Sequence, residues 1–375
     1  MRVLLAPDKF KGSLSAKGVI RALGNGIKKA CPQAQMHSVL ASDGGDGFLD
    51  AVANYVTTEK IVVDTVDPLE RPLKATYSIN RNTQKAYVEL AAASGLVLLE
   101  NTEKDPMNTS TFGTGIQIRD AIKEGAKTIY VGLGGSATND GGIGIANALG
   151  YTFLDASGKK LKPIGSNLSK IDRIESPKAT EVLKNIIIYA VNDVNNPLFG
   201  ETGAAHIYAK QKGAGAKEIA ILDDGLQQLD ELVQKQKGIK YADIPGAGAA
   251  GGTAYGLKTF ANAQFISGID FILQLAKIHE LIKKQPIDYL ITGEGKIDLQ
   301  TLNGKLIKGV LDLGRQYNIP VIAVCGSLDV DMKDLKEEGL HEVLEISDRS
   351  KPLAYNMRNA SELIERAIYT FFKGS

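Results

Sequence analysis

The strongest constraint on the fold is that both ends of the chain alternate short apolar runs with helical segments, whereas the middle follows a different pattern. The apolar runs that predict buried strands are Val3–Pro7, Met36–Ala41, Ile287–Thr292, Pro320–Cys325 and Glu342–Ile346. The predicted helices are Asp46–Tyr55, Lys305–Tyr317, Ser361–Phe372 and a segment with Val19, Ile20, Leu23 and Ile27 on one face, capped by Ser13 or Ser15. Such alternation is typical of a parallel sheet covered by helices.

The middle of the chain begins with three β-rich runs whose short polar connections predict an antiparallel meander. These runs are Lys60–Val66, Leu73–Ile79 and Lys85–Leu90. Farther along, helices are predicted at Gly115–Lys123, Ala216–Gln236 and Phe271–Lys284, strands at Thr128–Leu133 and Ile186–Val191, and turns over Asp155–Pro177. We therefore expect two domains, in which residues 1–59 and 286–375 form one α/β domain and residues 60–285 form a large inserted domain of mixed α/β structure.

Composition excludes several classes of function. Lys and Arg number 44 and Asp and Glu number 43, so the net charge of +1 argues against a nucleic-acid-binding or membrane-surface protein. No apolar run approaches the 18 or so residues that a membrane span needs. The two cysteines, Cys31 and Cys325, are too few for a disulfide framework, and the N-terminal apolar run is too short for a signal peptide. We expect a cytoplasmic enzyme, and a homo-oligomer is compatible with the sequence.

Five short segments combine Gly with Asp, Lys, Ser, Thr or Asn, and most of them follow a predicted strand. They are Ala6–Ser15, Ser42–Gly47, Gly132–Gly142, Val191–Leu198 and Ile291–Asp298. In open α/β sheets, ligands bind beyond the carboxyl ends of the strands. The position of these segments after predicted strands is therefore stronger evidence for a binding site than their Gly content is.

Two of the segments have the chemistry of anion sites. Ala6–Ser15 places two lysines and two hydroxyls at a helix N-terminus, which suits phosphate or carboxylate, although a capped helix with solvated lysines would look the same. Gly132–Gly142 offers successive backbone N–H groups together with Ser, Thr and Asn donors. Its glycines would cost needless conformational entropy in a purely structural loop, so we favour a phosphate site there.

The other three segments carry carboxylates. Asp43 and Asp46 lie three residues apart in a Gly-rich turn and can face one Mg²⁺, which prefers a few carboxylates together with phosphate and water. Asp193 can orient a hydroxyl or hold a metal. Ile291–Asp298 places a Thr, two acids and a Lys around glycines, which would suit phosphate or Mg²⁺. Asp-capped turns are the structural alternative for each.

One further motif matches a dinucleotide-binding fingerprint. Gly246–Gly251 satisfies GxGxxG, with Asp270 at a spacing of 270 − 251 = 19 residues. The preceding residues end in Pro and make a poor strand, so the required context is missing and a Gly-rich helix entry that lines the cleft is the better interpretation. The sequence also lacks a P-loop, the protein-kinase motifs and a GxSxG nucleophile elbow.

Taken together, six motifs resemble the bacterial class I glycerate kinases, in the same order and along nearly the whole chain. They are APDKFKGSLSA (6–16), SDGGDG (42–47), ELAAASG (89–95), GLGGSATNDGG (132–142), PGAGAAGG (245–252) and TGEGKID (292–298). The resemblance implies ATP- and Mg²⁺-dependent phosphorylation of D-glycerate, with 2-phosphoglycerate favoured over 3-phosphoglycerate as the product. It also implies that the domain built from both ends is Rossmann- or flavodoxin-like.

On this basis we expect an active site in the cleft between the domains. The expected catalytic residues are Asp8, Lys11 and Asp193, with Asp8 or Asp193 accepting the hydroxyl proton. The expected substrate-binding residues are Lys9, Ser13, Ser94 and Asn139. The expected phosphate- or nucleotide-binding residues are Gly134, Gly135, Ser136, Thr138, Thr292, Gly293 and Gly295. The expected Mg²⁺ ligands are Asp43, Asp46 and Glu294.

Three alternatives stay open at this point. The chain could be another small-molecule kinase on a Rossmann-like scaffold, which competition between substrates would reveal. It could be a non-catalytic ligand-binding regulator, which would bind tightly without turnover. It could be a dehydrogenase that uses Gly246–Gly251, which NAD would stabilise against heat.

Overall fold

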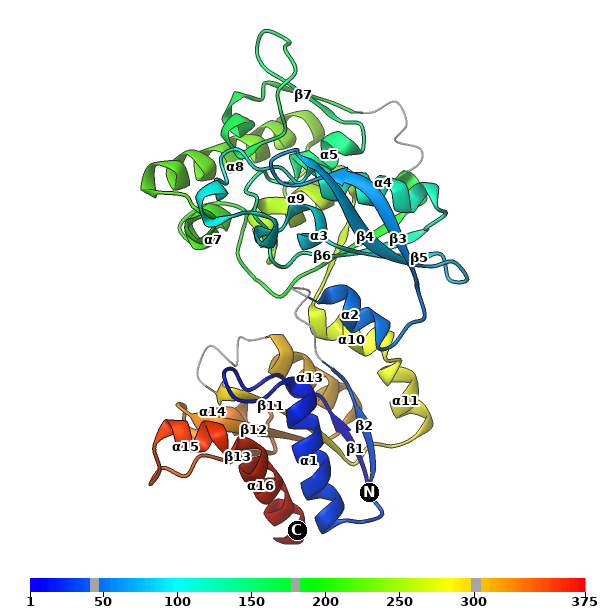
Figure 1. The fold of residues 1–375 in the computed structure, drawn as a ribbon, viewed down its shortest axis with the longest axis vertical. Helices are drawn as coiled ribbons and strands as arrows, with labels where there is room; N and C mark the ends of the chain where they lie inside the picture. The colour runs from blue at the N-terminus through cyan, green and yellow to red at the C-terminus, as the bar shows by residue number, and fades with distance from the viewer. Residues whose placement is uncertain (41–46, 177–182, 298–304, 375) are drawn as a thin grey trace. The chain divides into compact units, whose positions relative to one another are not determined.

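The computed structural model describes residues 1–40, 47–176, 183–297 and 305–374 (Figure 1). Contacts divide the chain into two compact units, Met1–Ser42 with Gly268–Ser375, and Asp43–Ser267. These bounds differ from the predicted domains over residues 43–59 and 268–285. We call them the first and the second unit and describe each by itself.

The first unit is built on a five-stranded sheet in which every pairing is parallel, as the two ends of the sequence predict. Its spatial order is β13-β12-β11-β1-β2, which is 2-1-3-4-5 in reverse when the five strands are numbered along the chain. The strands are β1 (Arg2–Leu5), β2 (Gln35–Ser38), β11 (Tyr289–Ile297), β12 (Val321–Leu328) and β13 (Glu342–Glu345). This is the flavodoxin-like order, and its switch point lies between β1 and β11.

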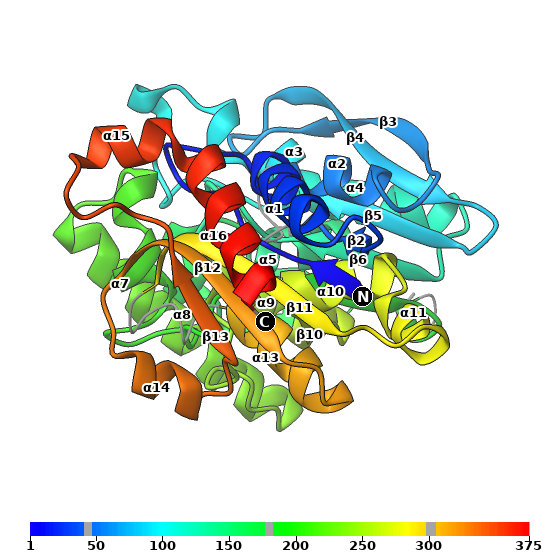
Figure 2. The ribbon, with the colours of Figure 1, turned by 90° about the horizontal axis from the view of Figure 1, so that it is seen from below.

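Helices cover both faces of this sheet. α1 (Ala16–Ala30) and α16 (Ala360–Gly374) lie side by side on one face, over a core that includes Val3, Leu5 and Ile322. α13 (Lys305–Tyr317) packs against β11 and β12 (Figure 2). Of the two predicted N-caps of α1, it is Ser15 whose side chain accepts the Gly18 N–H. The other helices in the described part of this unit are α10 (Gly268–Leu275), α11 (Ile278–Lys284), α14 (Met332–Glu337) and α15 (Leu353–Arg358).

Two predictions for this unit are wrong in detail. Residues 271–284 were expected to form one helix, but α10 and α11 are separated by Lys277, whose φ of 53° and ψ of 37° are left-handed. Strand β11 was expected to end at Thr292, but it continues to Ile297 because Glu294 and Lys296 keep parallel register with β12. Gly293 allows this close pairing, since a Cβ there would lie 2.2 Å from the Val324 carbonyl oxygen.

The second unit is built on a six-stranded mixed sheet with the order β10-β9-β6-β5-β4-β3. The strands are β3 (Glu59–Val66), β4 (Pro72–Asn80), β5 (Lys85–Glu89), β6 (Thr128–Gly132), β9 (Ile187–Val191) and β10 (Gln264–Ile266). β3, β4 and β5 pair antiparallel, which confirms the predicted meander, whereas β5, β6, β9 and β10 are parallel.

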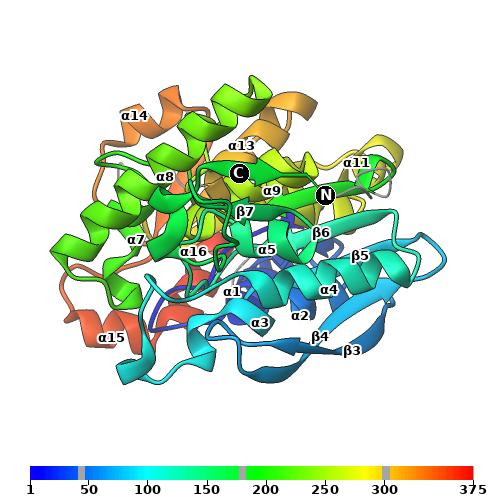
Figure 3. The same cartoon turned by 90° about the horizontal axis from the view of Figure 1, so that it is seen from above.

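Helices α4 (Phe112–Lys123), α5 (Ile143–Ala148) and α9 (Ala249–Ala261) pack on this sheet over Val88, Ile129 and Ile188 (Figure 3). The long helix α8 (Ala216–Lys237) packs with α9 in a second core. The other elements are the helices α2 (Phe48–Ala53), α3 (Ala91–Ser94) and α7 (Ala204–Tyr208), the antiparallel pair β7 (Thr152–Leu154) and β8 (Arg173–Glu175), and the 3-10 helices η1 (Leu96–Leu98), η2 (Asn101–Glu103), η3 (Gly165–Lys170) and η4 (Lys210–Lys212). Thus β8 and η3 form within the segment Asp155–Pro177, which was predicted to be rich in turns.

None of the helices in the described part of the chain is both long enough and apolar enough to cross a membrane.

Candidate functional site

A pocket of about 490 Å³ opens in the first unit beside the carboxyl ends of β1 and β13. The predicted site residues that line it are Asp8, Lys9, Lys11, Ser13, Glu294 and Gly295. The loop after β1 passes over β11, because the Asp8 N–H donates to the Gly293 carbonyl at 2.8 Å. A Cβ on Gly295 would lie 3.3 Å from the Lys11 backbone nitrogen, so glycine at this position allows β11 and the segment after β1 to lie close together.

The polar side of this pocket is basic and partly held in place. The Asp8 carboxylate accepts the Lys9 N–H at 2.7 Å, and the Ser13 hydroxyl donates to the Met357 carbonyl at 2.6 Å. Lys296, which also lines the pocket, forms an exposed ion pair with Asp329 at 2.8 Å. With its proton donated to Met357, the Ser13 oxygen retains acceptor capacity only. The lysines are therefore the groups best suited to an anion here.

Part of the pocket lining is apolar. It is formed by Phe10, Ile346, Leu353, Met357 and Ala360. Leu353, which lines the pocket from α15, is 71% exposed. A ligand with an apolar part next to an anionic part would fit this combination of walls.

Two residues predicted to bind phosphate or nucleotide do not line this pocket. Thr292 is fully buried, and its hydroxyl donates to the Ala6 carbonyl at 3.0 Å, which ties β11 to β1. Gly293 is buried between β11 and β12. In this structure both residues hold β11 against its neighbouring strands.

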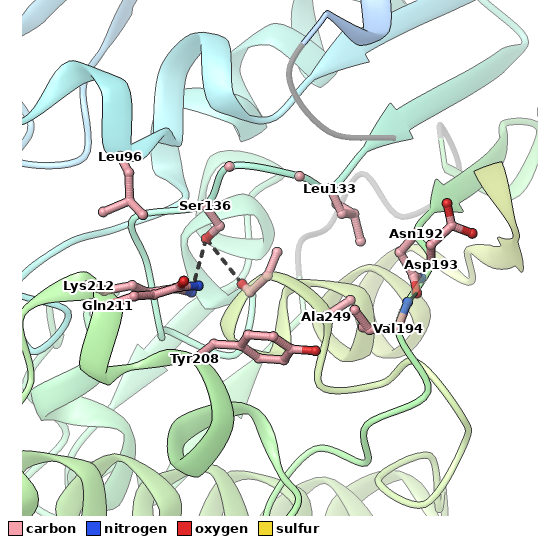
Figure 4. A pocket seen from close by; sticks show the side chains of 13 residues that line it. Leu96, Leu133, Ser136, Asn192, Asp193, Val194, Tyr208, Gln211, Lys212 and Ala249 are labelled. Atoms are coloured by element: carbon pink, nitrogen blue, oxygen red, sulfur yellow. Dashed lines mark hydrogen bonds between the residues drawn. The ribbon is translucent and has the colours of Figure 1, made fainter. Parts of the chain in front are cut away.

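A second pocket, of about 370 Å³, lies in the second unit, beside the loops that follow β6 and β9 (Figure 4). Four of the predicted site residues line it, namely Gly134, Gly135, Ser136 and Asp193. Gly135 has a φ of 69°, and its carbonyl accepts the Leu96 N–H at 2.8 Å, so the loop is fixed against η1. Ala249 and Ala250, at the start of α9, form part of the wall.

The GxGxxG motif at the start of α9 is a packing element. The residues before it form turns and no strand, as expected, and Ala250, Gly251 and Gly252 are all left-handed. A Cβ on Gly251 would lie 2.0 Å from the Thr138 carbonyl oxygen. The motif therefore lets α9 approach the Gly-rich loop of residues 132–142, and the context of a dinucleotide fingerprint is absent.

The remaining predicted residues of the second unit lie inside the protein. Ser94 is fully buried and shares a hydrogen bond of 2.8 Å with Thr114, while Thr138 shares one of 3.0 Å with Ser136. Asn139 is fully buried, and neither side-chain polar atom has a hydrogen-bond partner. These side chains do not line the second pocket.

Asp140 anchors the end of the Gly-rich loop, a role that the sequence did not indicate. Its carboxylate accepts four hydrogen bonds, from the N–H and hydroxyl of Thr111 at 2.8 Å each and from the N–H groups of Gly142 at 3.0 Å and Gly144 at 3.2 Å. Complete burial raises the pKa of this carboxyl, and the four donors oppose that rise. The loop thus contains a charge-bearing residue that faces the interior rather than a ligand.

Lys212 is a pocket residue that the sequence likewise did not indicate. It belongs to η4, is only 2% exposed and lines the second pocket with Tyr208 and Gln211 (Figure 4). Its ammonium donates to the Thr138 carbonyl at 2.6 Å and approaches the Ser136 hydroxyl at 3.5 Å. Burial lowers the pKa of Lys212 to about 7. In the sequence it stands in KQKGAGAK among other lysines, and nothing in that pattern distinguishes it.

The expected Mg²⁺ ligands are only partly visible. Asp43 and Asp46 lie outside the described residues. Within the described ranges, no group of three or more His, Cys, Asp or Glu side chains could hold a metal ion. Glu294 and Asp8 line the same pocket, and oxygen ligands of this kind suit Mg²⁺, which needs only one or two carboxylates when phosphate and water complete its shell.

Comparison with known proteins gives matches along almost the whole chain. The model of the glycerate kinase family matches residues 3–373. A glycerate kinase from Halalkalibacterium halodurans is 38% identical over 97% of this chain and 96% of its own, and a glycerate 2-kinase from Escherichia coli K12 is 36% identical over 98% and 96%. A crystal structure from Salmonella typhimurium LT2, assigned as a glycerate kinase 2, has a TM-score of 0.80 at 33% identity and covers 100% of this chain and 98% of its own.

Proposed function

Since the chain belongs to the glycerate kinase family, we propose that it transfers the terminal phosphoryl group of ATP to a hydroxyl of D-glycerate and forms 2-phosphoglycerate. The observation that carries this proposal is the pair of pockets, each lined by lysine and by a loop that follows a parallel strand. The name of the Escherichia coli relative, a glycerate 2-kinase, supports the choice of product.

Phosphoryl transfer depends on positioning and charge neutralisation more than on covalent chemistry by the protein. We assign the transferred phosphates to the backbone N–H groups of Gly134, Gly135 and Ser136, whose loop is held by η1. We assign the substrate carboxylate to Lys11, with Lys9 and the Ser13 oxygen beside it.

The two candidate bases lie in different pockets, and this makes them separable by experiment. Asp8 lines the pocket of the first unit, and Asp193 lines the pocket of the second. The base has to lie within hydrogen-bond reach of the hydroxyl that attacks. Since Lys11 lines the same pocket as Asp8, assigning the substrate carboxylate to Lys11 favours Asp8, and a larger loss of activity in Asp193→Asn would contradict that assignment.

Mg²⁺ would neutralise charge on the nucleotide phosphates when bound. Glu294 is the described carboxylate that we assign to it, together with Asp43 and Asp46 from outside the described residues. We propose a cytoplasmic location and no nucleic-acid or membrane partner, which the near-neutral charge supports.

The proposal is tested by a coupled ADP-release assay with D-glycerate, ATP and Mg²⁺, with the product identified by ³¹P NMR. Turnover to 2-phosphoglycerate is expected. Turnover only with another hydroxy acid would refute the substrate, and no ADP release with any acceptor would refute the phosphotransfer reaction.

Variants locate the site within the same assay. Lys11→Ala should reduce kcat/KM by about 10²–10³-fold, because it removes an electrostatic partner of the substrate. Lys17→Ala is the matched control, since Lys17 is an exposed lysine on α1 outside the pocket. Of Asp8→Asn and Asp193→Asn, the variant of the true base should lose activity by the larger factor. A fully active, folded variant would remove that residue from the site.

A further inference from the structure

Lys212 is a buried cation that the proposed roles leave unused. It is 2% exposed, whereas Lys210, two residues earlier on η4, is exposed. Burying an ammonium group is costly unless it is paired and hydrogen-bonded. At a purely structural position, burying a neutral side chain would cost less free energy.

The groups that contact the Lys212 ammonium are neutral. They are the Thr138 carbonyl at 2.6 Å and the Ser136 hydroxyl at 3.5 Å. Among the described residues no carboxylate forms a salt bridge with it, and Asp140, whose charge favours the ammonium form, has its own oxygens occupied by Thr111, Gly142 and Gly144. The positive charge is therefore without a direct counter-ion in the described structure.

Lys212 lines the second pocket, and the hydrogen bonds inside the protein do not use all the donors of its ammonium group. An ammonium has three N–H donors, and Lys212 has two acceptors inside the protein, the second of them long. Figure 4 shows the end of Lys212 beside Ser136, in the wall that also contains the Gly134–Ser136 loop. An anionic oxygen placed against this loop would supply both the missing acceptor and the missing charge.

We propose that Lys212 binds the anionic group of the ligand held in the second pocket, as the counter-charge to a phosphate or carboxylate oxygen. This rests on the proposed function only in that both reactants of that reaction, the nucleotide and D-glycerate, carry such oxygens. It adds to the Gly134–Ser136 loop the single charged donor that the sequence analysis did not provide.

Binding of an anion by this group is coupled to a proton. Burial lowers the pKa of Lys212 to about 7, so at pH 8 the side chain of the free protein is mostly neutral. An anion in contact favours the ammonium form and so draws in a proton. Among the described residues, Asp193 and Tyr208 are the other titratable groups that line the pocket, and Asp140 acts on Lys212 from within the protein. Burial raises the pKa of Tyr208, which keeps it neutral at pH 8.

The test is isothermal titration calorimetry at pH 8 in two buffers of different ionisation enthalpy, with ATP, pyrophosphate and D-glycerate titrated separately. Wild-type protein should take up about one proton per bound anion for at least one of these ligands. Lys212→Met should lose that uptake and bind about 10–10²-fold more weakly, because a charge-assisted hydrogen bond is worth about 1.5–3 kcal/mol. Lys210→Met is the matched control and should behave as wild type.

Lys212→Arg separates charge from proton coupling. Its guanidinium is always charged, so any binding that it supports should occur without proton uptake. Uptake with ATP and pyrophosphate identifies phosphate as the ligand group, and uptake with D-glycerate alone identifies carboxylate. The wild-type measurement stands even if a variant fails to fold.

The proposal is overturned if wild-type protein binds these anions without proton uptake, if it binds none of them, or if Lys212→Met keeps both affinity and uptake. Weaker anion binding by Lys212→Met with unchanged proton uptake would also overturn it. That result would mean that Lys212 acts only by holding the Thr138 carbonyl in place. Turnover of D-glycerate is measured separately, so a wild-type kinase without Lys212-dependent uptake refutes only this inference. Lys212-dependent binding of pyrophosphate without turnover refutes only the proposed function.

Discussion

Replacing Lys212 with methionine should remove a pH dependence from the stability of the chain. The pKa of this lysine falls from the ordinary 10.5 to about 7 on folding. Between these values the unfolded chain binds more protons than the folded one, so the stability of the wild-type protein rises with pH across that window. The linkage relation gives a cost of burial of about 4 kcal/mol at pH 7 and about 2 kcal/mol at pH 9, a difference of about 2 kcal/mol.

The assay is urea unfolding followed by circular dichroism at pH 7 and pH 9, for wild type, Lys212→Met and the exposed control Lys210→Met. The stability difference between Lys212→Met and wild type should be more favourable to the variant at pH 7 than at pH 9 by about 2 kcal/mol. Loss of the hydrogen bond to the Thr138 carbonyl shifts both values equally, so the change with pH is the decisive quantity. An equal difference at both pH values would refute the reasoning.

Three other substitutions test the hydrogen bonds and the glycine packing described above, two of them against a control variant. Asp140→Asn should destabilise the chain by about 1–3 kcal/mol, because the NH₂ that replaces one carboxylate oxygen cannot accept the groups that donate to it, whereas Asp224→Asn, at an exposed aspartate on α8, should unfold at nearly the wild-type urea midpoint. Gly251→Ala should lower both the urea midpoint and kcat/KM, since its Cβ would lie 2.0 Å from the Thr138 carbonyl oxygen. Gly158→Ala, also at positive φ but with open space around it, should show the backbone strain alone. Thr292→Val should cost about 1 kcal/mol and leave kcat/KM within threefold, because its hydroxyl donates to Ala6; a tenfold loss of kcat/KM would instead place that hydroxyl on a ligand.

Much of the fold is predictable because local periodicity and strand connectivity agree. The apolar runs at the two ends form one parallel sheet, and the polar connections between β3, β4 and β5 make the antiparallel meander. The break at Lys277 is not predictable, since a left-handed lysine has no sequence signature of the kind that Gly or Pro provides. The extension of β11 through residues 293–297 depends on pairing with β12, which is a long-range contact and not a local preference.

The site is predictable where it depends on strand ends and not where it depends on burial. Asp8, Lys11 and Gly134 follow strands and line pockets, as the rule for open α/β sheets indicates. Lys212 lies on a 3-10 helix that is far in sequence from any described strand end, and its distinguishing property is that folding buries it. Composition cannot separate such a lysine from its exposed neighbours.

The glycines of the second unit have two structural roles: some allow two backbone segments to pack closely, and others line the pocket. The glycines of the 132–142 segment were interpreted as a phosphate cradle, but a Cβ on Gly142 would lie 2.9 Å from the Gly256 Cα and one on Gly256 would lie 2.4 Å from the Gly141 carbonyl oxygen. These glycines let the loop and α9 pack backbone against backbone, which buries Thr138 and Asp140. Of the glycines in this segment, only Gly134 and Gly135 line the pocket. The packed glycines therefore hold the pocket-lining part of the loop in a fixed geometry, and the phosphate-binding role that we propose for it requires such a donor array, fixed before the ligand arrives.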